Sequence, residues 1–216
     1  MALTLPNGSS LALGTNYGSS KVMSAVSNAA QAVATLEASH GVVANDVILV
    51  SSGWDGLDGR VVRAKSVSTN DVTLDEIDTS SLTKYPAGSG VGTIKEVTAW
   101  TPITQILEFA TEGGDQEFWA YQFLESRTRR QVPTVQSPIA INVVLGDDQS
   151  KPWYEALDAA HDAGTIQALR LTLPSGAIIY YGVYVSFQRT PTLVANQGMS
   201  VRASFALVGD VTRYAS

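Results

Sequence analysis

The chain has 216 residues, of which 44% are hydrophobic and 16% are charged, a balance that allows one large domain or two small ones. It contains no cysteine and only two histidines, so disulfides, thiolate metal sites and a histidine-rich metal centre are not expected. The net charge of −6 is divided equally between residues 1–98 and residues 99–216. No basic excess marks a nucleic-acid-binding face, and the acidic balance alone fits any soluble bacterial protein.

Neither a membrane span nor a secretory signal is expected from the sequence. No run of about 18 apolar residues occurs, which is the length that a membrane-spanning helix needs. The first ten residues, MALTLPNGSS, lack a basic segment followed by an apolar one. The absence of cysteine fits folding in a reducing compartment without requiring it.

A small β-barrel is predicted for residues 22–98. Turn clusters at residues 52–56 and 87–90 separate short candidate strands, and this spacing is typical of a barrel. The candidate strands are 32–37, 46–51, 60–67, 72–74 and 92–97. Three glycines at 88, 90 and 92 do not make a dinucleotide fingerprint, because strand-like sequence follows them where a helix would be needed.

Aromatic residues alternate in a candidate strand near the middle of the chain. Trp119, Tyr121 and Phe123 would lie on one face of this strand. The pattern favours burial in the core of the subunit. Burial at an interface is the alternative, because aromatic residues and arginine are enriched at interfaces.

One basic cluster follows the aromatic strand. It consists of Arg127, Arg129 and Arg130. These arginines can belong to a solvated loop or to a polar arm that pairs with acids on a neighbouring subunit. Nucleic-acid binding is the weakest of the three interpretations, since no basic field surrounds the cluster.

The last third of the chain shows a strict two-residue alternation of apolar and polar residues. The alternating segments are 139–145, 169–173, 179–187 and 199–207. Each would form a strand with one apolar face and one mixed face. Such strands build an antiparallel sheet that needs a second layer over its apolar side.

A single helix is predicted over residues 151–163. Ser150 is the expected N-cap, Pro152 is tolerated in the first turn and Gly164 can close the helix. One narrow apolar stripe consists of Trp153, Leu157 and Ala160. The helix is therefore expected to pack against a sheet.

No catalytic constellation is found. His161 falls late in the predicted helix, where it can favour the negative end of the helix dipole, and His40 precedes a turn. Neither a nucleophile elbow nor a zinc-protease motif occurs. Paired acids at 75–76 and 147–148 lie at predicted turns and are interpreted as solvated. We therefore expect no enzyme activity, no cofactor and no metal site.

Several stretches resemble the major tail tube proteins of lambda-like bacteriophages, which have long, non-contractile tails. The resembling stretches are ASHG at 38–41, GW at 53–54, GR at 59–60, PAGSG at 86–90, GGDQ at 113–116, YQFLE at 121–125, DD at 147–148, PWY at 152–154, YVSF at 184–187 and PTL at 191–193. Each is weak alone, but their order along the chain is moderately specific.

The resemblance implies a mainly β fold, in which a tail-tube-type β-sandwich or barrel is flanked by one α-helix. Residues 1–21 would be its N-terminal strand or arm and residues 99–216 its core. Residues 22–98 would be a small inserted β-barrel-like domain on the tube exterior. Six subunits would close into a homohexameric ring, and the rings would stack into a helical polymer.

The resemblance also implies the partners of such a subunit. Copies of the chain itself, a tape measure protein, and tail terminator and tail tip proteins would contact it. DNA would pass through the lumen during genome ejection without specific binding, and no membrane would be involved. The subunit would be located in the virion tail after assembly in the bacterial host cytoplasm.

Two sets of residues are candidates for these contacts. The inter-ring arm candidates are Glu112, Asp115, Arg127, Arg129 and Arg130. The lumen candidates, taken from the polar faces of the alternating strands, are Asn142, Thr172, Tyr184, Ser200 and Ser204. Short hydroxyl and amide side chains suit a wall that must not hold phosphates.

Two alternative functions remain open at this point. The first is another virion component, such as a tail terminator, a head–tail joining protein or a decoration protein. The second is a carbohydrate-binding module built on residues 22–98, in which Trp54 would stack on a sugar ring.

Overall fold

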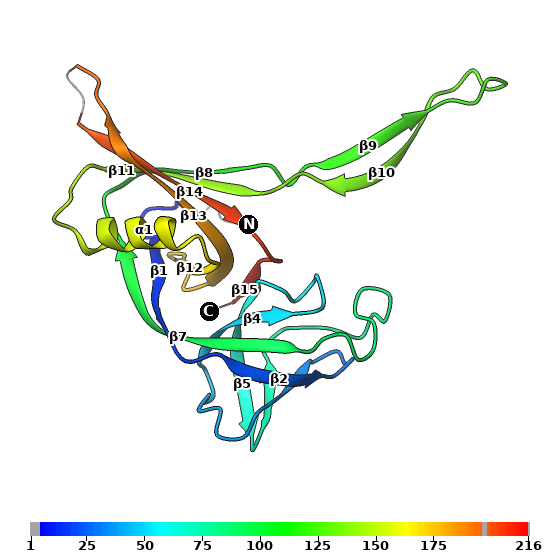
Figure 1. Ribbon diagram of the computed structural model, residues 1–216. Helices are drawn as coiled ribbons and strands as arrows, with labels where there is room; N and C mark the ends of the chain where they lie inside the picture. Colours follow the sequence, from blue (N-terminus) through cyan, green and yellow to red (C-terminus); the bar gives the residue numbers. More distant parts are fainter. Residues whose placement is uncertain (1–4, 196–197, 216) are drawn as a thin grey trace.

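The computed structural model describes residues 5–195 and 198–215, and within them the chain is mainly β with one α-helix (Figure 1). The strands are β1 (Ser10–Tyr17), β2 (Lys21–Val26), β3 (Val33–Leu36), β4 (Val47–Ser52), β5 (Val61–Ser68), β6 (Asp71–Leu74), β7 (Gly92–Ile103), β8 (Ile106–Glu112), β9 (Gln116–Tyr121), β10 (Arg130–Gln136), β11 (Ala140–Gly146), β12 (Gln167–Thr172), β13 (Ile178–Thr192), β14 (Ser200–Leu207) and β15 (Thr212–Tyr214), and the helix is α1 (Pro152–Ala163).

The first half of the chain forms a small closed barrel, as the spacing of its strands predicts. Its strands are hydrogen-bonded in the order β2-β3-β6-β5-β4-β7, and a β2–β7 pairing closes the circle. Trp54 lies in the interior of this barrel, 1% exposed, and its indole N–H donates to the carbonyl oxygen of Pro86 at 2.8 Å. The barrel has a core of its own, separate from the rest of the chain.

The second half forms one curved antiparallel sheet in the order β7-β1-β12-β13-β14-β11-β8. The predicted alternation sets its packing, because side chains of successive strand residues point to opposite faces. Ile141, Val143 and Leu145 point to the same side as Val201, Ala203 and Phe205, and all of them are buried in one core with α1. The predicted β-sandwich with one flanking helix is confirmed.

Helix α1 covers the apolar side of this sheet through Trp153, Leu157 and Ala160. Gly164 ends the helix in the left-handed conformation, φ 57°, as predicted. The predicted N-cap is wrong: the N-cap residue is Lys151, and no side chain caps the helix. The hydroxyl of Ser150 donates instead to Asp148 at 2.6 Å, because the carboxylate two residues earlier is the stronger acceptor.

A third apolar cluster joins the barrel to the curved sheet. It contains Val61 and Val97 from the barrel side and Ala168, Tyr180 and Tyr214 from the sheet side. The alternation over residues 179–187 places Tyr180 on the mixed face of its strand. Tyr180 is 4% exposed because the barrel covers this end of the sheet. Asp75 of the barrel, interpreted as solvated from the sequence, is 6% exposed, because Arg63 and Tyr214 lie against it.

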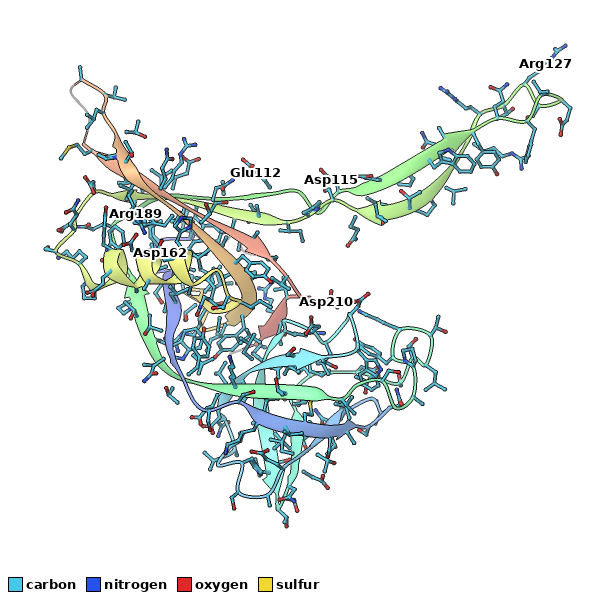
Figure 2. The ribbon with its side chains drawn as sticks, viewed as in Figure 1. Glu112, Asp115, Arg127, Asp162, Arg189 and Asp210 are labelled. Atoms are coloured by element: carbon cyan, nitrogen blue, oxygen red, sulfur yellow. The ribbon has the colours of Figure 1, made fainter. Side chains whose placement is uncertain are left out.

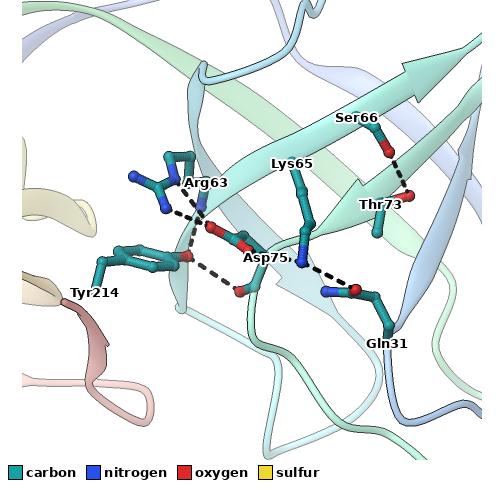
Figure 3. A network of polar contacts seen from close by, with 7 residues as sticks. All are labelled: Gln31, Arg63, Lys65, Ser66, Thr73, Asp75 and Tyr214. Carbon is teal, nitrogen blue, oxygen red and sulfur yellow. Dashed lines mark hydrogen bonds and ion pairs between the residues drawn. The ribbon is translucent and has the colours of Figure 1, made fainter. Parts of the chain in front are cut away.

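Tyr214 is the centre of the polar contacts at this junction (Figure 3). The backbone N–H of Arg63 donates to its hydroxyl at 2.9 Å, and the hydroxyl donates to the carbonyl oxygen of Asp75 at 3.2 Å. The Arg63 guanidinium lies 4.3 Å from the centre of the Tyr214 ring and bonds the Asp75 carboxylate at 2.6 Å and 3.0 Å. Strand β15 is thereby fixed to the barrel.

The chain enters and leaves the barrel at adjacent positions. Tyr17 at the end of β1 is paired with Val97 in β7, and the N–H of Gly18 donates to the carbonyl oxygen of Glu96 at 2.9 Å. Neighbouring ends are usual for an inserted domain.

Strands β9 and β10 form a hairpin that projects away from both cores (Figure 1). It continues the line of β8 and β11, from which it is separated by Gly113 and Gly114 on one limb and by Ser137 and Pro138 on the other. We call residues 115–137 the arm.

Candidate assembly surfaces

The arm exposes large apolar side chains on both of its faces. Phe118 is 57% exposed, Trp119 62% and Phe123 53%, whereas the core of each half is buried. The expectation that Trp119, Tyr121 and Phe123 lie in the core of the subunit is therefore wrong. A two-stranded ribbon has no second layer to bury its aromatic side chains, so they need cover from another molecule.

The aromatic side chains form a continuous row along one face of the arm. The rings of Trp119 and Tyr121 are stacked with their centres 5.2 Å apart, and Tyr121 meets the edge of Phe123 at 5.3 Å. Val132 lies opposite Trp119 and Arg130 lies opposite Tyr121 in the hairpin. The row therefore ends beside the basic tip.

The five arm candidates are distributed along the whole length of this extension. Glu112 ends β8 and Asp115 starts the arm, while Arg127 lies near the tip (Figure 2). All five are exposed, and the ion pairs present among the described residues involve none of them. Their charges are thus available to a neighbouring molecule.

The root of the arm is a glycine pair in the left-handed region. Gly113 has φ 81° and Gly114 has φ 83°. A Cβ on Gly113 would overlap with the carbonyl oxygen of Pro138, so only glycine fits there without movement of the other limb. The two limbs are joined by bonds from Gly114 N–H to the Ser137 oxygen at 3.2 Å and from Ser137 N–H to the Asp115 oxygen at 2.9 Å.

Four of the five lumen candidates share one face of the curved sheet. Asn142 lies opposite Ser204, which lies opposite Ser186 on the next strand, and Tyr184 and Ser200 point to the same side. This polar face is the side of β8, β11, β14 and the second part of β13 that points away from the core. Thr172 is not part of it, since it lies at the end of β12 next to Ile178, by the junction with the barrel.

The two arginines on mixed strand faces have different surroundings. Arg170 lies with its guanidinium 4.7 Å from the centre of the Trp100 ring, in a cation–π contact. Arg202 is exposed on the polar face. It lies opposite Val144 of β11, which in turn lies opposite Glu108 of β8.

Two of the open edges of the curved sheet were not indicated by the sequence. Within residues 5–195 and 198–215, no strand pairs with the outer side of β8. In the same residues, β13 has no partner beyond Val183 on the side of β12. Unpaired strand edges are templates for pairing with another chain.

An apolar groove of about 520 Å³ adjoins the β8 edge. Leu107 and Phe109 from β8 line it together with Leu171 and Leu173. Leu107 is 67% exposed and Phe109 38%, although Phe109 points to the core side of the sheet. The core of the curved sheet is therefore incompletely covered at this edge.

A pair of salt bridges connects β13 to α1 and was also missed in the sequence analysis. The Arg189 guanidinium bonds Asp158 and, at 2.7 Å, Asp162 (Figure 2). These two acids are four residues apart on one helix face, where like charges repel. That spacing was the signal that a cation from another element lies between them.

The histidines have no chemical role in this arrangement. His40 accepts from the N–H of Val42 at 3.1 Å and lies 3.0 Å from the carbonyl oxygen of Thr69, which fixes a turn. His161 is exposed in the last turn of α1. The described residues contain no metal-binding group of histidine, cysteine and acids, and no described helix is long and apolar enough to cross a membrane.

A curved β-sheet with open edges, an extended hairpin and an uncovered apolar groove defines a subunit that completes its structure by self-association. Residues 52–216 match the family described as "Phage tail tube protein, TTP". The chain belongs to this family. It is a structural protein of the phage tail and not an enzyme.

Solved structures of similar proteins come from tail-like particles. The chain is 15% identical to a chain in "Virion of native gene transfer agent (GTA) particle", over 54% of this chain and 89% of that one, with a TM-score of 0.42. It is 14% identical to a chain in "Tail of empty GTA particle computed with helical refinement, C6 symmetry", over 54% of this chain and 87% of that one, with a TM-score of 0.43. It is 13% identical to a chain of the "anti-feeding prophage cap (AFP tube terminating cap)", over 55% of this chain and 84% of that one, with a TM-score of 0.36. No curated protein matches the chain.

Proposed function

We propose that six copies of this chain close into a ring, that the rings stack into the tail tube of a phage with a long, non-contractile tail, and that the genome passes through the lumen. The number six follows the resemblance of the sequence to lambda-like tail tube proteins. The observation that carries the proposal is the pair of open edges on the curved sheet.

The strand directions allow the two edges to pair in a closed ring. Neighbouring strands in the order β8, β11, β14 and β13 are all antiparallel, so β8 and β13 run in opposite directions. In a cyclic ring every copy has the same orientation along the axis. The β8 edge of one copy can therefore pair antiparallel with the β13 edge of the next, which leaves neither of these two edges open.

The same pairing covers the apolar groove beside β8. A strand added to β8 brings side chains to both faces of the sheet, one of which faces Leu107 and Phe109. Ring closure thus removes the exposed apolar surface and the unpaired backbone groups together.

The polar face is the proposed lumen wall. Asn142, Ser186, Ser204 and Tyr184 offer neutral hydrogen-bonding groups that exchange readily with water. Arg202 is the only cation of the described part of this face, and Glu108 two strands away balances its charge. A wall without a net positive charge lets DNA slide. Helix α1 lies on the opposite side of the sheet and hence outside the barrel.

The arm is the proposed contact between rings. It leaves the sheet at the end marked by Glu112 and Ala140, along the strand direction, and carries exposed charges of both signs. The partners beyond the tube itself are proposed from the resemblance: a tape measure protein inside, tail terminator and tip proteins at the ends. Assembly in the host cytoplasm has the same basis.

Electron microscopy of the purified, concentrated protein tests the proposal. Rings or tubes of uniform width are expected from the native chain, and a map of the tube should place Ser204 on the inner wall. Leu107→Lys puts a charge into the groove beside β8 and should leave a folded subunit that forms no rings. The matched control is Val43→Lys, at a residue that is 59% exposed on the barrel. Tubes of normal length from Leu107→Lys would contradict ring closure through β8.

The same images separate the remaining alternative. A tail terminator or a head–tail joining protein should stop at one ring, whereas a tube subunit continues to stack. The carbohydrate-binding interpretation loses its basis, because Trp54 is buried in the barrel and cannot stack on a sugar.

A further inference from the structure

We infer that the arm of one subunit lies in a groove between α1 and β1 of a subunit in the next ring. This inference rests on the proposed function, in which the arm connects the rings, and adds the surface that receives it. The groove has a volume of about 430 Å³ and runs along one side of the helix. It is lined by α1, β1, β7 and β12, and its helix residues include Glu155, Ala156, Ala159 and Ala163.

The groove has the shape and chemistry that a row of aromatic side chains needs. Ala156, Ala159 and Ala163 carry only methyl side chains and so leave space along the helix. Alternate residues on a strand are about 7 Å apart, and residues four apart on a helix are about 6 Å apart. The rings of Trp119, Tyr121 and Phe123 can therefore settle between successive turns of α1.

The positions of the arm and the groove in the fold agree with stacking in one direction. Strand β11 starts at Ala140, beside the arm, and ends at Gly146, from which the chain continues into the first turn of α1. The N-terminal end of α1 thus lies at the end of the sheet opposite the arm (Figure 1). Rings stacked with one orientation bring the arm of each ring to this end of the next.

The length of the arm is sufficient for this contact. Each limb has about ten residues and extends about 33 Å at the usual rise of a strand. Helix α1 has 12 residues and a length of about 18 Å at the usual helical rise. An arm that enters at the N-terminal end of α1 can reach beyond its C-terminal end.

The charges of the two surfaces are complementary. The tip, residues 122–131, contains three arginines and one glutamate. Asp158 and Asp162 lie in the second half of α1, where they share a single cation, Arg189. Glu155 lines the groove in the first turn of the helix, away from the position of the arginines. An arm that runs along α1 from its start places the arginines at the C-terminal end, which carries the negative pole of the helix dipole.

The apolar groove beside β8 is a weaker candidate for the surface that receives the arm. It lies directly beside the β8 edge, which ring closure covers with the neighbour in the same ring. The α1 groove contains no residue of β8 and does not adjoin that edge.

Cross-linking in assembled tubes tests the inference, since the chain has no native cysteine. Tyr121→Cys and Phe123→Cys are each combined with Ala159→Cys, and tubes are treated with an oxidant or with a short bismaleimide. A ladder of covalent oligomers is expected, which reduction removes in the oxidised samples. Single variants should give no ladder. The matched control combines Tyr121→Cys with Val43→Cys on the barrel and should also give none.

The outcomes separate this inference from the proposed function. Tubes that form without any cross-link to Ala159→Cys would overturn the groove as the acceptor and leave the tube function intact. Cross-linking of Ala159→Cys to Leu107→Cys would show that a lateral neighbour covers the groove, which also overturns the inference. A variant that lacks residues 115–137 and still makes long tubes would refute the inter-ring role of the arm itself.

Discussion

Tyr214 joins the barrel to the curved sheet through both its ring and its hydroxyl group. The ring packs in the junction cluster beneath the Arg63 guanidinium, and the hydroxyl bonds two backbone groups of the barrel. A residue two positions before the end of the chain thus fixes strand β15 between two separately packed cores. Neither hydropathy nor alternation distinguishes Tyr214 from an exposed terminal tyrosine, because its partners lie about 140 and 150 residues away in the sequence.

Removing this hydroxyl should destabilise the whole chain. Tyr214→Phe keeps the ring but leaves the N–H of Arg63 without its acceptor, which typically costs about 1–3 kcal/mol. Denaturant unfolding measures the loss. Tyr184→Phe is the matched control, because Tyr184 is 45% exposed on the polar face and should change the unfolding free energy little. Equal effects of the two substitutions would show that the Tyr214 hydroxyl contributes nothing.

Two buried phenols predict a loss of stability in alkali. Burial raises the pKa of Tyr17 and that of Tyr214 to about 12, from 10.0. The folded state holds both groups neutral, so their contribution is complete below pH 10 and is lost as the pH rises towards 12. The unfolding free energy should therefore fall in this window. The double variant Tyr17→Phe, Tyr214→Phe should show a shallower fall, with the remainder due to Tyr180 and Tyr181, whose pKa values burial also raises.

At the scale of single elements, the strands of the second half follow directly from the sequence. The four alternating segments are β11, β12, β13 and β14, and their apolar rows are largely buried as the pattern predicts, although Met199, which precedes β14, is 54% exposed. The fate of the opposite faces could not be predicted. Tyr180 and Tyr184 lie four residues apart on one face of β13, yet the barrel buries the first and leaves the second in solvent.

For the arm, the sequence pattern predicted burial where the structure shows exposure. Trp119 and Tyr121 alternate in β9 as core residues do, because an aromatic row that awaits a second molecule has the same period as one buried within the chain. The flanking glycines and the arginine cluster were the only local signs of an extension. A strand that carries an aromatic row between a glycine pair and a basic tip can thus be distinguished from a strand whose aromatic row is buried within the chain.

The glycine pair gives a prediction for the arm as an element. Gly113→Ala adds a Cβ that overlaps with the Pro138 carbonyl oxygen, so the root of the arm must shift. We expect a folded subunit whose tubes are shorter or absent in electron micrographs. Gly88→Ala is the matched control: φ is 79°, but nothing lies within 4 Å of the added carbon. It should cost about 1–2 kcal/mol of backbone strain in the barrel and leave tube formation unchanged.

At the scale of the whole molecule, the sequence indicated two β units and one helix, and the barrel strands lie in the chain between β1 and the second part of β7. The packing between the units was not foreseeable. It joins residues from faces that each look polar or half-buried in their own strands, such as Ala168 and Tyr180. Contacts between distant segments leave no periodic signal in either one.

The adjacent ends of the barrel predict that it can be removed. Replacing residues 19–95 with a short glycine-serine linker joins Gly18 to Glu96, which are already hydrogen-bonded neighbours. The variant should keep the curved sheet and form tubes, with lower stability because Tyr180 and Tyr214 lose their cover. Circular dichroism on heating and electron microscopy measure the two effects. A chain without a cooperative thermal transition would show that the barrel is indispensable to the tube core.

The glycine pair at the root of the arm has a mechanical consequence for the proposed tube. Copies within a ring would be joined by hydrogen-bonded strands, which resist stretching around the circumference. Rings would be joined through arms that pivot on Gly113 and Gly114, residues with a wide range of accessible backbone angles. Such a filament resists changes of its inner diameter but bends easily. The tube can therefore curve along its length while the channel stays open.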